Sequence, residues 1–229
     1  MDWFAPLDNY CERTDPSYWS EPLNAVSNAA FLVAALVCWR MIGDRRDPGA
    51  RILVVILAAI GVGSYLFHTH ARRWALMADV IPIQVFILVY LYLATVRLFA
   101  APWWAGLAAV ALFIPFDVLA ARGLAALVGP LNGSVSYGPV PILIAAYALA
   151  LRNRAPAAAR GLAIGAAVLV VSLFFRTIDA AVCPGLPLGT HFLWHLLNGL
   201  MLGWMIAVLI RHSPAAPTPA DLANPGRRG

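Results

Sequence analysis

The sequence predicts an all-α membrane protein, a bundle of seven transmembrane helices. Of its 229 residues, 62% are hydrophobic and only 12% are charged, whereas soluble domains are about 45–50% apolar and about 25% charged. A soluble fold of this size has nowhere to bury so much apolar surface, but a lipid bilayer can cover it. The apolar residues are also grouped into runs close to the length of about 20 residues that crosses a bilayer as a helix.

Seven apolar runs follow one another along the chain, with short polar connections between them. The fifth run is short and opens at Pro139 and Pro141, so we expect its helix to begin earlier, near Ser134. The predicted spans cover residues 24–41, 52–69, 79–100, 103–121, 138–151, 161–178 and 190–211.

The chain reads as one membrane domain, residues 1–212, that opens with an acidic N-terminal segment, residues 1–23. No internal repeat is evident. The tail, residues 213–229, is rich in Pro and Ala, so we expect it to be disordered.

The basic residues predict the orientation in the membrane. All 16 are arginine, and with seven spans five of them fall on the N-terminal side and eleven on the other. Because basic residues concentrate in cytoplasmic connections, we expect the N-terminus outside and the C-terminus in the cytoplasm. This placement accounts for the net charge of +5 without a nucleic-acid partner. The Arg-only, Ala-rich composition is typical of a GC-rich bacterial genome, in which case the outside is the periplasm.

Polar and ionisable side chains inside a membrane are costly, so each is a candidate for function. Five of them lie near the predicted outer surface and come from three spans. They are Ser64 and His68 at the end of the second span, Asp79 at the start of the third, and His191 and His195 at the start of the seventh.

The spacing of these residues indicates a metal site near the outer face. His191 and His195 are four residues apart and therefore share one helix face, and His68 follows Ser64 by the same interval. Three imidazoles with an open fourth position for water are the ligand set of a catalytic zinc. A pair of histidines at this spacing also arises by chance, but three histidines with a serine and an aspartate at one depth favour the zinc site.

The acidic N-terminal segment is a candidate binding site for a second metal ion. Five of the 11 acidic residues precede the first span, and a cluster of hard oxygen ligands suits calcium. No EF-hand spacing is present, so composition alone favours a solvated acidic segment. These residues are Asp2, Asp8, Glu12, Asp15 and Glu21.

Two of the three cysteines, Cys11 and Cys183, lie on the predicted outer side, where a disulfide is permitted. Such a bond would tie the N-terminal segment to the loop before the seventh span. Cys38 lies within the first span and is expected to pack as a small apolar residue.

Two further carboxylates, Asp117 and Asp179, lie near the outer ends of the fourth and sixth spans. We expect them to cap helices or to pair with Arg122 and Arg176. These roles are structural rather than chemical.

Four stretches of the chain, in order, resemble the alkaline ceramidases, seven-span zinc amidases that cleave ceramide into sphingosine and a fatty acid. YCERTDPSYWSEPLNAVSN resembles the family's N-terminal Cys-Glu segment and the Glu-x-x-Asn-x-x-Ser-Asn that follows it. GSYLFHTHARRWALMADVIP matches Ser-x-x-x-His followed eleven residues later by Asp. TIDAAVC resembles the end of span six, and THFLWHLLNGL matches the His-x-x-x-His helix.

The resemblance implies roles for individual residues. His68, His191 and His195 would hold zinc, with Ser64 and Asp79 as the polar partners at the metal.

It also implies that Cys11 and Cys183 form a disulfide and that calcium binds to the N-terminal segment through Glu12 and Glu21. The calcium ligands depart from the family pattern, because Asn9 and Thr14 stand where the family has Asp and Asn. Two acidic residues beside them, Asp8 and Asp15, are the remaining candidates.

The expected reaction is metal-assisted hydrolysis of a lipid amide taken from the membrane. Zinc would activate water and polarise the amide carbonyl, Asp79 would shuttle the proton, and Ser64 would donate a hydrogen bond to the oxyanion. The alternatives are a hydrolase of another lipid amide or ester, and a receptor or transporter with a structural metal. A retinal protein is excluded because the chain has no Lys for the Schiff base. The sequence does not specify an oligomeric state.

Overall fold

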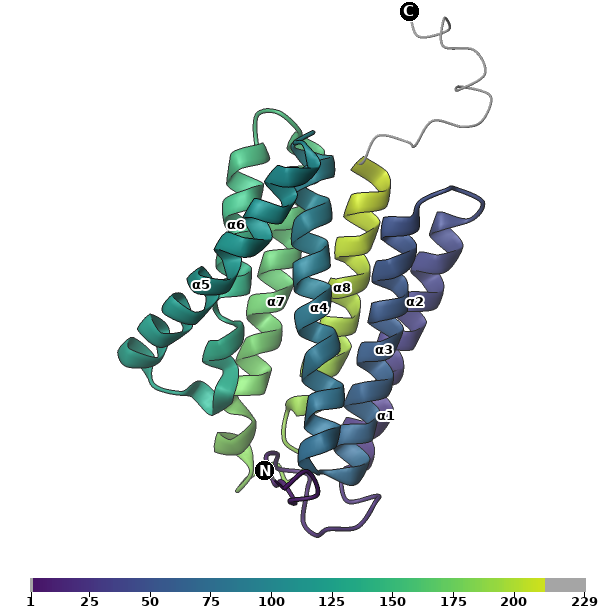
Figure 1. The fold of residues 1–229 in the computed structure, drawn as a ribbon. Helices are drawn as coiled ribbons and strands as arrows, with labels where there is room; N and C mark the ends of the chain where they lie inside the picture. The colour runs from purple at the N-terminus through teal and green to yellow at the C-terminus, as the bar shows by residue number, and fades with distance from the viewer. Residues whose placement is uncertain (1, 213–229) are drawn as a thin grey trace, which may run out of the picture.

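Seven helical segments in the described part of the chain, residues 2–212, are long and apolar enough to cross a membrane. This computed structural model therefore confirms the predicted all-α seven-span architecture (Figure 1). The first span combines two helices and the fifth combines a 3₁₀ helix with an α-helix. The elements are α1 (Pro22–Ser27), α2 (Ala29–Ile42), α3 (Pro48–His70), α4 (Arg73–Leu98), α5 (Trp103–Val128), η1 (Leu131–Tyr137), α6 (Pro139–Leu151), α7 (Pro156–Val182) and α8 (His191–His212). The predicted disordered tail, 213–229, lies outside the described residues.

Local sequence signals set where the helices begin. Proline suits the first turn because its missing N–H has no helical partner there, and four helices start with one: Pro22, Pro48, Pro139 and Pro156. Before α3, the Asp47 side chain accepts a hydrogen bond from the Ala50 N–H at 2.9 Å, which caps the helix. The same carboxylate accepts two hydrogen bonds from Arg97, at 2.7 and 2.8 Å, and so ties the start of α3 to the end of α4.

Several helices run past the apolar runs that predicted them. α4 begins at Arg73 rather than at 79, and α5 continues to Val128 rather than ending at 121. Hydropathy detects only the part of a helix that lies in the hydrocarbon core of the bilayer. The backbone hydrogen bonds of the helix continue into the membrane–water interface, where arginine and tryptophan are tolerated. As a result, Asp79 lies in the second turn of α4 instead of opening it.

Helix α8 runs through the middle of the bundle, packed against α2, α3, α4 and α7 (Figure 1). Small residues allow this close packing. A Cβ atom on Gly199 would lie 3.0 Å from Ala30, and one on Gly203 would lie 3.0 Å from Ala34. Because α8 is held on several sides, the two histidines at its start have a well-defined position.

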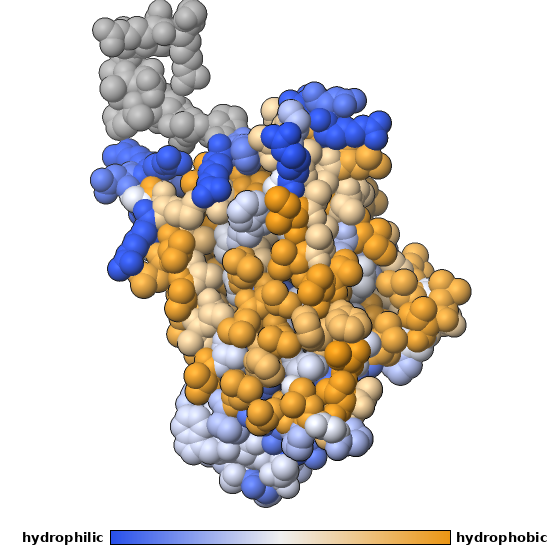
Figure 2. All heavy atoms as spheres, turned by 180° about the vertical axis from the view of Figure 1, so that it is seen from behind, coloured by the Kyte–Doolittle hydropathy of each residue, from blue (hydrophilic) through white to orange (hydrophobic). Residues whose placement is uncertain are grey.

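The surface has an apolar belt between two polar ends (Figure 2). The end next to the described C-terminus is the more strongly hydrophilic and carries the arginine-rich connections. The orientation stays a prediction from arginine placement, with the arginine-poor end outside.

Candidate metal centre

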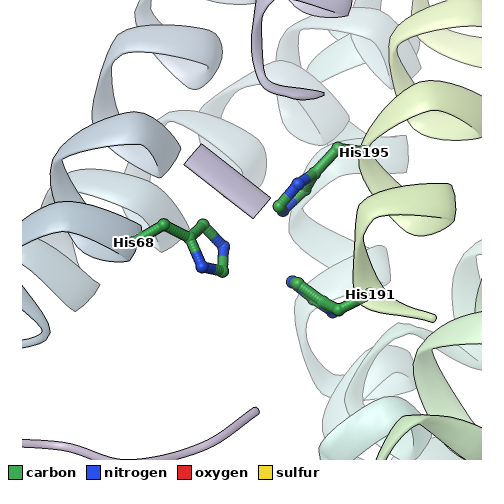
Figure 3. Close-up of side chains that lie close together, drawn as sticks. All are labelled: His68, His191 and His195. Atoms are coloured by element: carbon green, nitrogen blue, oxygen red, sulfur yellow. The ribbon is translucent and has the colours of Figure 1, made fainter. Parts of the chain in front are cut away.

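Three histidine side chains from two helices lie close together (Figure 3). They belong to the end of the bundle that holds few arginines. His68 belongs to the last turn of α3, while His191 and His195 occupy the first two turns of α8. One ring nitrogen of each lies within 4.8 Å of the others. All three side chains are buried, with at most 2% of their surface exposed.

Hydrogen bonds occupy one ring nitrogen on two of the three histidines. Nδ1 of His68 lies 2.6 Å from the Glu21 carboxylate, and Nδ1 of His195 lies 2.8 Å from the Ser27 hydroxyl. Among the described residues, the buried side-chain nitrogens without a hydrogen-bond partner are Nε2 of His68, Nε2 of His195 and Nδ1 of His191.

Buried polar atoms without a partner carry a desolvation cost, and they are uncommon in folded proteins. Three such nitrogens on neighbouring rings match the donor set of a tri-histidine zinc site. Two of the rings donate their other N–H to a carboxylate or a hydroxyl, as metal-bound imidazoles do, and this contact sets the tautomer. The residues present therefore fit a zinc ion.

A buried carboxylate positions the first histidine of α8. Asp179 accepts hydrogen bonds from the backbone N–H groups of Thr190, at 2.7 Å, and His191, at 2.9 Å. Its second oxygen accepts from the Cys11 N–H at 3.1 Å. Of the two roles expected for Asp179, it takes the capping role, at the start of α8, which also joins the N-terminal segment to the metal centre.

The N-terminal segment covers the histidines. The predicted disulfide between Cys11 and Cys183 is present and joins this segment to the loop before α8. Next to it, the Tyr10 ring stacks on His191, with ring centroids 3.6 Å apart and planes at 20°. The disulfide lies at the arginine-poor end, which agrees with the prediction that this end faces the oxidising side of the membrane.

An apolar cavity runs from the metal centre into the bundle. Ser64, Asp79 and His195 line it at the histidine end, and Tyr90 and Met205 line it deeper in. Ten residues of α8 separate His195 from Met205, which at 1.5 Å per residue is a depth of roughly 15 Å. The remaining lining is almost entirely apolar, so the cavity is suited to a hydrocarbon chain with its polar end at the histidines.

Sequence comparison assigns this architecture to a known family. The model of the ceramidase family matches residues 8–218, almost the whole chain. The chain belongs to the ceramidase family. The match confirms the resemblance drawn from the four sequence stretches, whereas comparison with individual curated proteins found no match. Membership supports a ceramide-hydrolysing activity in general, carried out by an amide hydrolase on a lipid substrate.

The carboxylates expected to hold calcium in this ceramidase are engaged elsewhere or exposed. Both oxygens of Glu12 accept hydrogen bonds, at 2.7 Å each, from the first backbone N–H groups of α1. Glu21 bonds to Arg13 and His68, and Asp8 and Asp15 are exposed. Within residues 2–212, only the three histidines form a group placed to hold a metal ion. The arrangement therefore does not fit calcium.

The surroundings of the buried Glu21 carboxylate favour its charged form. Burial raises the pKa of Glu21, but the hydrogen bond from His68 and the charge of Arg13 outweigh it and bring the pKa below its usual value. The negative charge of Glu21 can therefore pair with Arg13 and orient the ring of His68.

An arginine that sequence reasoning left out of the site lies beside two aromatic rings of the cavity wall. The Arg176 guanidinium donates to the Asn132 carbonyl at 2.7 Å and lies over the rings of Tyr137 and Trp194, at 5.4 and 5.7 Å. Both rings line the cavity. The signal was available, because a charged residue inside an apolar run is itself a candidate for function.

The role of Asp179 yields a stability prediction. In Asp179→Asn, an amide N–H₂ replaces the oxygen that faces the Cys11 N–H, so a buried donor loses its acceptor. We expect a loss of about 1–3 kcal/mol in the free energy of unfolding, measured as a lower melting temperature in detergent. Asp117→Asn is the matched control, because Asp117 has no hydrogen bond or ion pair within the described residues. Equal melting temperatures for the two variants would contradict the capping role.

Proposed function

We propose that the chain is a zinc-dependent ceramidase that hydrolyses the amide bond of ceramide at the outer end of the bundle. The observation that supports this most directly is the set of three unpartnered imidazole nitrogens at the polar end of an apolar cavity. Family membership supplies the reaction class, and the cavity supplies a place for the lipid.

The shape of the site suggests how ceramide lies in it. One hydrocarbon chain enters the cavity, whose walls are supplied by α2, α3, α4, η1, α6, α7 and α8. The amide group then lies at the end lined by Ser64, Asp79 and His195. The site is buried, so bulk water is excluded and the polar side chains act in a low-dielectric environment.

Each polar side chain at this end has a part in the reaction. A bound zinc ion would supply Lewis acidity toward the carbonyl and an activated water. Asp79 accepts a proton from the water as its oxygen adds to the carbonyl carbon, and it passes that proton to the amide nitrogen as the C–N bond breaks. The hydroxyl of Ser64, one turn before His68, donates a hydrogen bond to the oxyanion. The products are a fatty acid and a sphingoid base.

The proposal is tested with purified protein in detergent and a set of lipids of matched chain length: ceramide, a simple N-acyl amine and the corresponding ester. We expect the sphingoid base to be released from ceramide, activity to be lost on zinc removal, and activity to return when zinc is restored. Cleavage of another lipid amide but not of ceramide would show that the substrate is wrong while the chemistry is right. Full activity in protein shown to be free of metal would overturn the proposal.

A further inference from the structure

Arg13 occupies the place where the acidic segment was expected to bind a divalent cation. Its side chain is buried and lies between the N-terminal segment and the end of α3. The guanidinium Nε donates to Glu21 at 2.5 Å. Nη1 donates to the carbonyls of Asp15 and Ser17, at 3.1 and 3.4 Å, and Nη2 donates to the carbonyl of His68 at 2.9 Å.

These contacts surround Arg13 with four oxygens. Three belong to the N-terminal segment, namely the Glu21 carboxylate and the carbonyls of Asp15 and Ser17, and the fourth is the His68 carbonyl in the last turn of α3. Carboxylate and carbonyl oxygens are also the ligands of calcium. The guanidinium is permanently charged, and the carbonyl end of a helix attracts a cation.

Arg13 and a calcium ion are alternatives at this place. Both oxygens of Glu21 already accept hydrogen bonds, from Arg13 and from His68. A divalent cation bound to Glu21 would have to displace the guanidinium or lie against it, and two neighbouring cations in a buried site repel strongly. The neutralising charge for Glu21 is therefore supplied by the chain itself.

Two hydrogen bonds connect Arg13 through Glu21 to His68 in the metal centre. Glu21 accepts a hydrogen bond from Nδ1–H of His68, which leaves Nε2 of that ring as the lone-pair donor. Arg13 holds Glu21 in this position and also binds the backbone carbonyl of His68. Outer contacts of this kind determine the tautomer and direction of a metal-binding imidazole.

We propose that Arg13 is a built-in cation that replaces calcium and orients His68 through Glu21, so that the zinc centre forms without any second metal. The proposal rests on the histidines binding zinc, as proposed above. Arg13 is a positioning residue, because it acts through Glu21 and His68.

The first test measures the response of the parent protein to calcium. Purified protein in metal-depleted buffer receives zinc, and then either calcium or magnesium at about 1 mM, a concentration sufficient for extracellular calcium sites. We expect the melting temperature and the zinc affinity to be the same in both. A higher melting temperature or a tighter zinc affinity with calcium alone would overturn the proposal.

The second test removes the guanidinium. We expect Arg13→Ala to weaken zinc affinity by roughly 10–100-fold and to change the visible absorption spectrum of the cobalt-substituted protein, which reports the ligand geometry. Arg13→Lys, which keeps the charge but not the planar fork, should recover part of the affinity. The control is Arg72→Ala, because Arg72 is exposed and holds the Phe4 carbonyl without contacting Glu21 or His68.

Parental zinc affinity and cobalt spectrum in Arg13→Ala would overturn the positioning role. Should that variant not fold, Arg13→Lys supplies the comparison: we expect a changed cobalt spectrum and an intermediate zinc affinity, and parental values would overturn the proposal. Zinc binding is measured without substrate, so the result does not depend on ceramide hydrolysis. Protein that binds zinc, ignores calcium and cleaves no ceramide would refute the proposed function and leave the role of Arg13 standing.

Discussion

Replacing His195 by alanine is expected to remove most of the bound zinc and most of the ceramide hydrolysis. The substitution deletes one of the three nitrogen donors, and the two that remain do not complete a tri-histidine site. His195 is the ring that both belongs to the histidine cluster and lines the lipid cavity. The loss of zinc affinity should therefore exceed the roughly 10–100-fold that removal of an outer contact costs. Zinc per chain, measured by elemental analysis, and product release are the two readouts.

Two further variants calibrate this result. Ser27→Ala removes the hydroxyl at Nδ1 of His195 but leaves the ring in place, so we expect the smaller, outer-contact loss of zinc affinity. His70→Ala changes an exposed histidine two residues from His68 and should leave zinc content unchanged. Full zinc occupancy in His195→Ala would show that the histidine cluster is not the metal site.

Asp79→Asn should separate the chemistry from metal binding. The substitution keeps the shape of the side chain but removes the proton acceptor. Asp79 lies outside the group of residues placed to hold a metal ion, which consists of three histidines. We expect turnover to fall by about 10²–10⁴-fold while zinc content and lipid binding stay close to the parent values. Turnover of a long-chain ceramide is measured beside elemental zinc and binding of a non-hydrolysable lipid analogue.

Ser64→Ala and Asp117→Asn give the comparison for Asp79. Loss of the Ser64 hydroxyl removes one oxyanion donor, at a cost of roughly 10²–10³ in rate. Asp117 lies on α5, which does not line the cavity, so its amide variant should work at the parent rate. Parental turnover in Asp79→Asn with zinc present would rule out the proton-shuttle role, even if ceramide proves to be the substrate.

Hydropathy was sufficient for the number and order of the spans, because burying apolar side chains in lipid dominates the energetics of such a chain. Helix ends were harder to predict. Arg73 and Trp74 lower the hydropathy of the first turn of α4, yet they are helical because the interface accepts them. The i, i+4 spacing of His191 and His195 was enough to place both rings on one face, since that relation is internal to one helix.

The hydrogen-bond partners of the histidine rings could not be predicted from the spacing of residues along the sequence. Glu21 lies 47 residues from His68, and Ser27 lies 168 residues from His195. Both pairs meet only because α1 folds against α3 and α8. Asp179 caps α8 from the neighbouring helix α7, because these two helices pack against each other.

The sequence by itself determined a seven-span membrane protein, its three candidate zinc ligands and the pairing of Cys11 with Cys183 through the family resemblance. The spans follow from composition, the shared face of His191 and His195 follows from helical periodicity, and the disulfide pairing is what the resemblance implied. Only the tertiary structure decided how the charges of the N-terminal segment are used. In the sequence, Glu21 is one of five acidic residues ahead of the first span, and the family resemblance implies that it binds calcium. In the fold, the side chain of Arg13 contacts both that carboxylate and the His68 carbonyl, because packing brings the N-terminal segment against the end of α3 and places these charged groups next to one another.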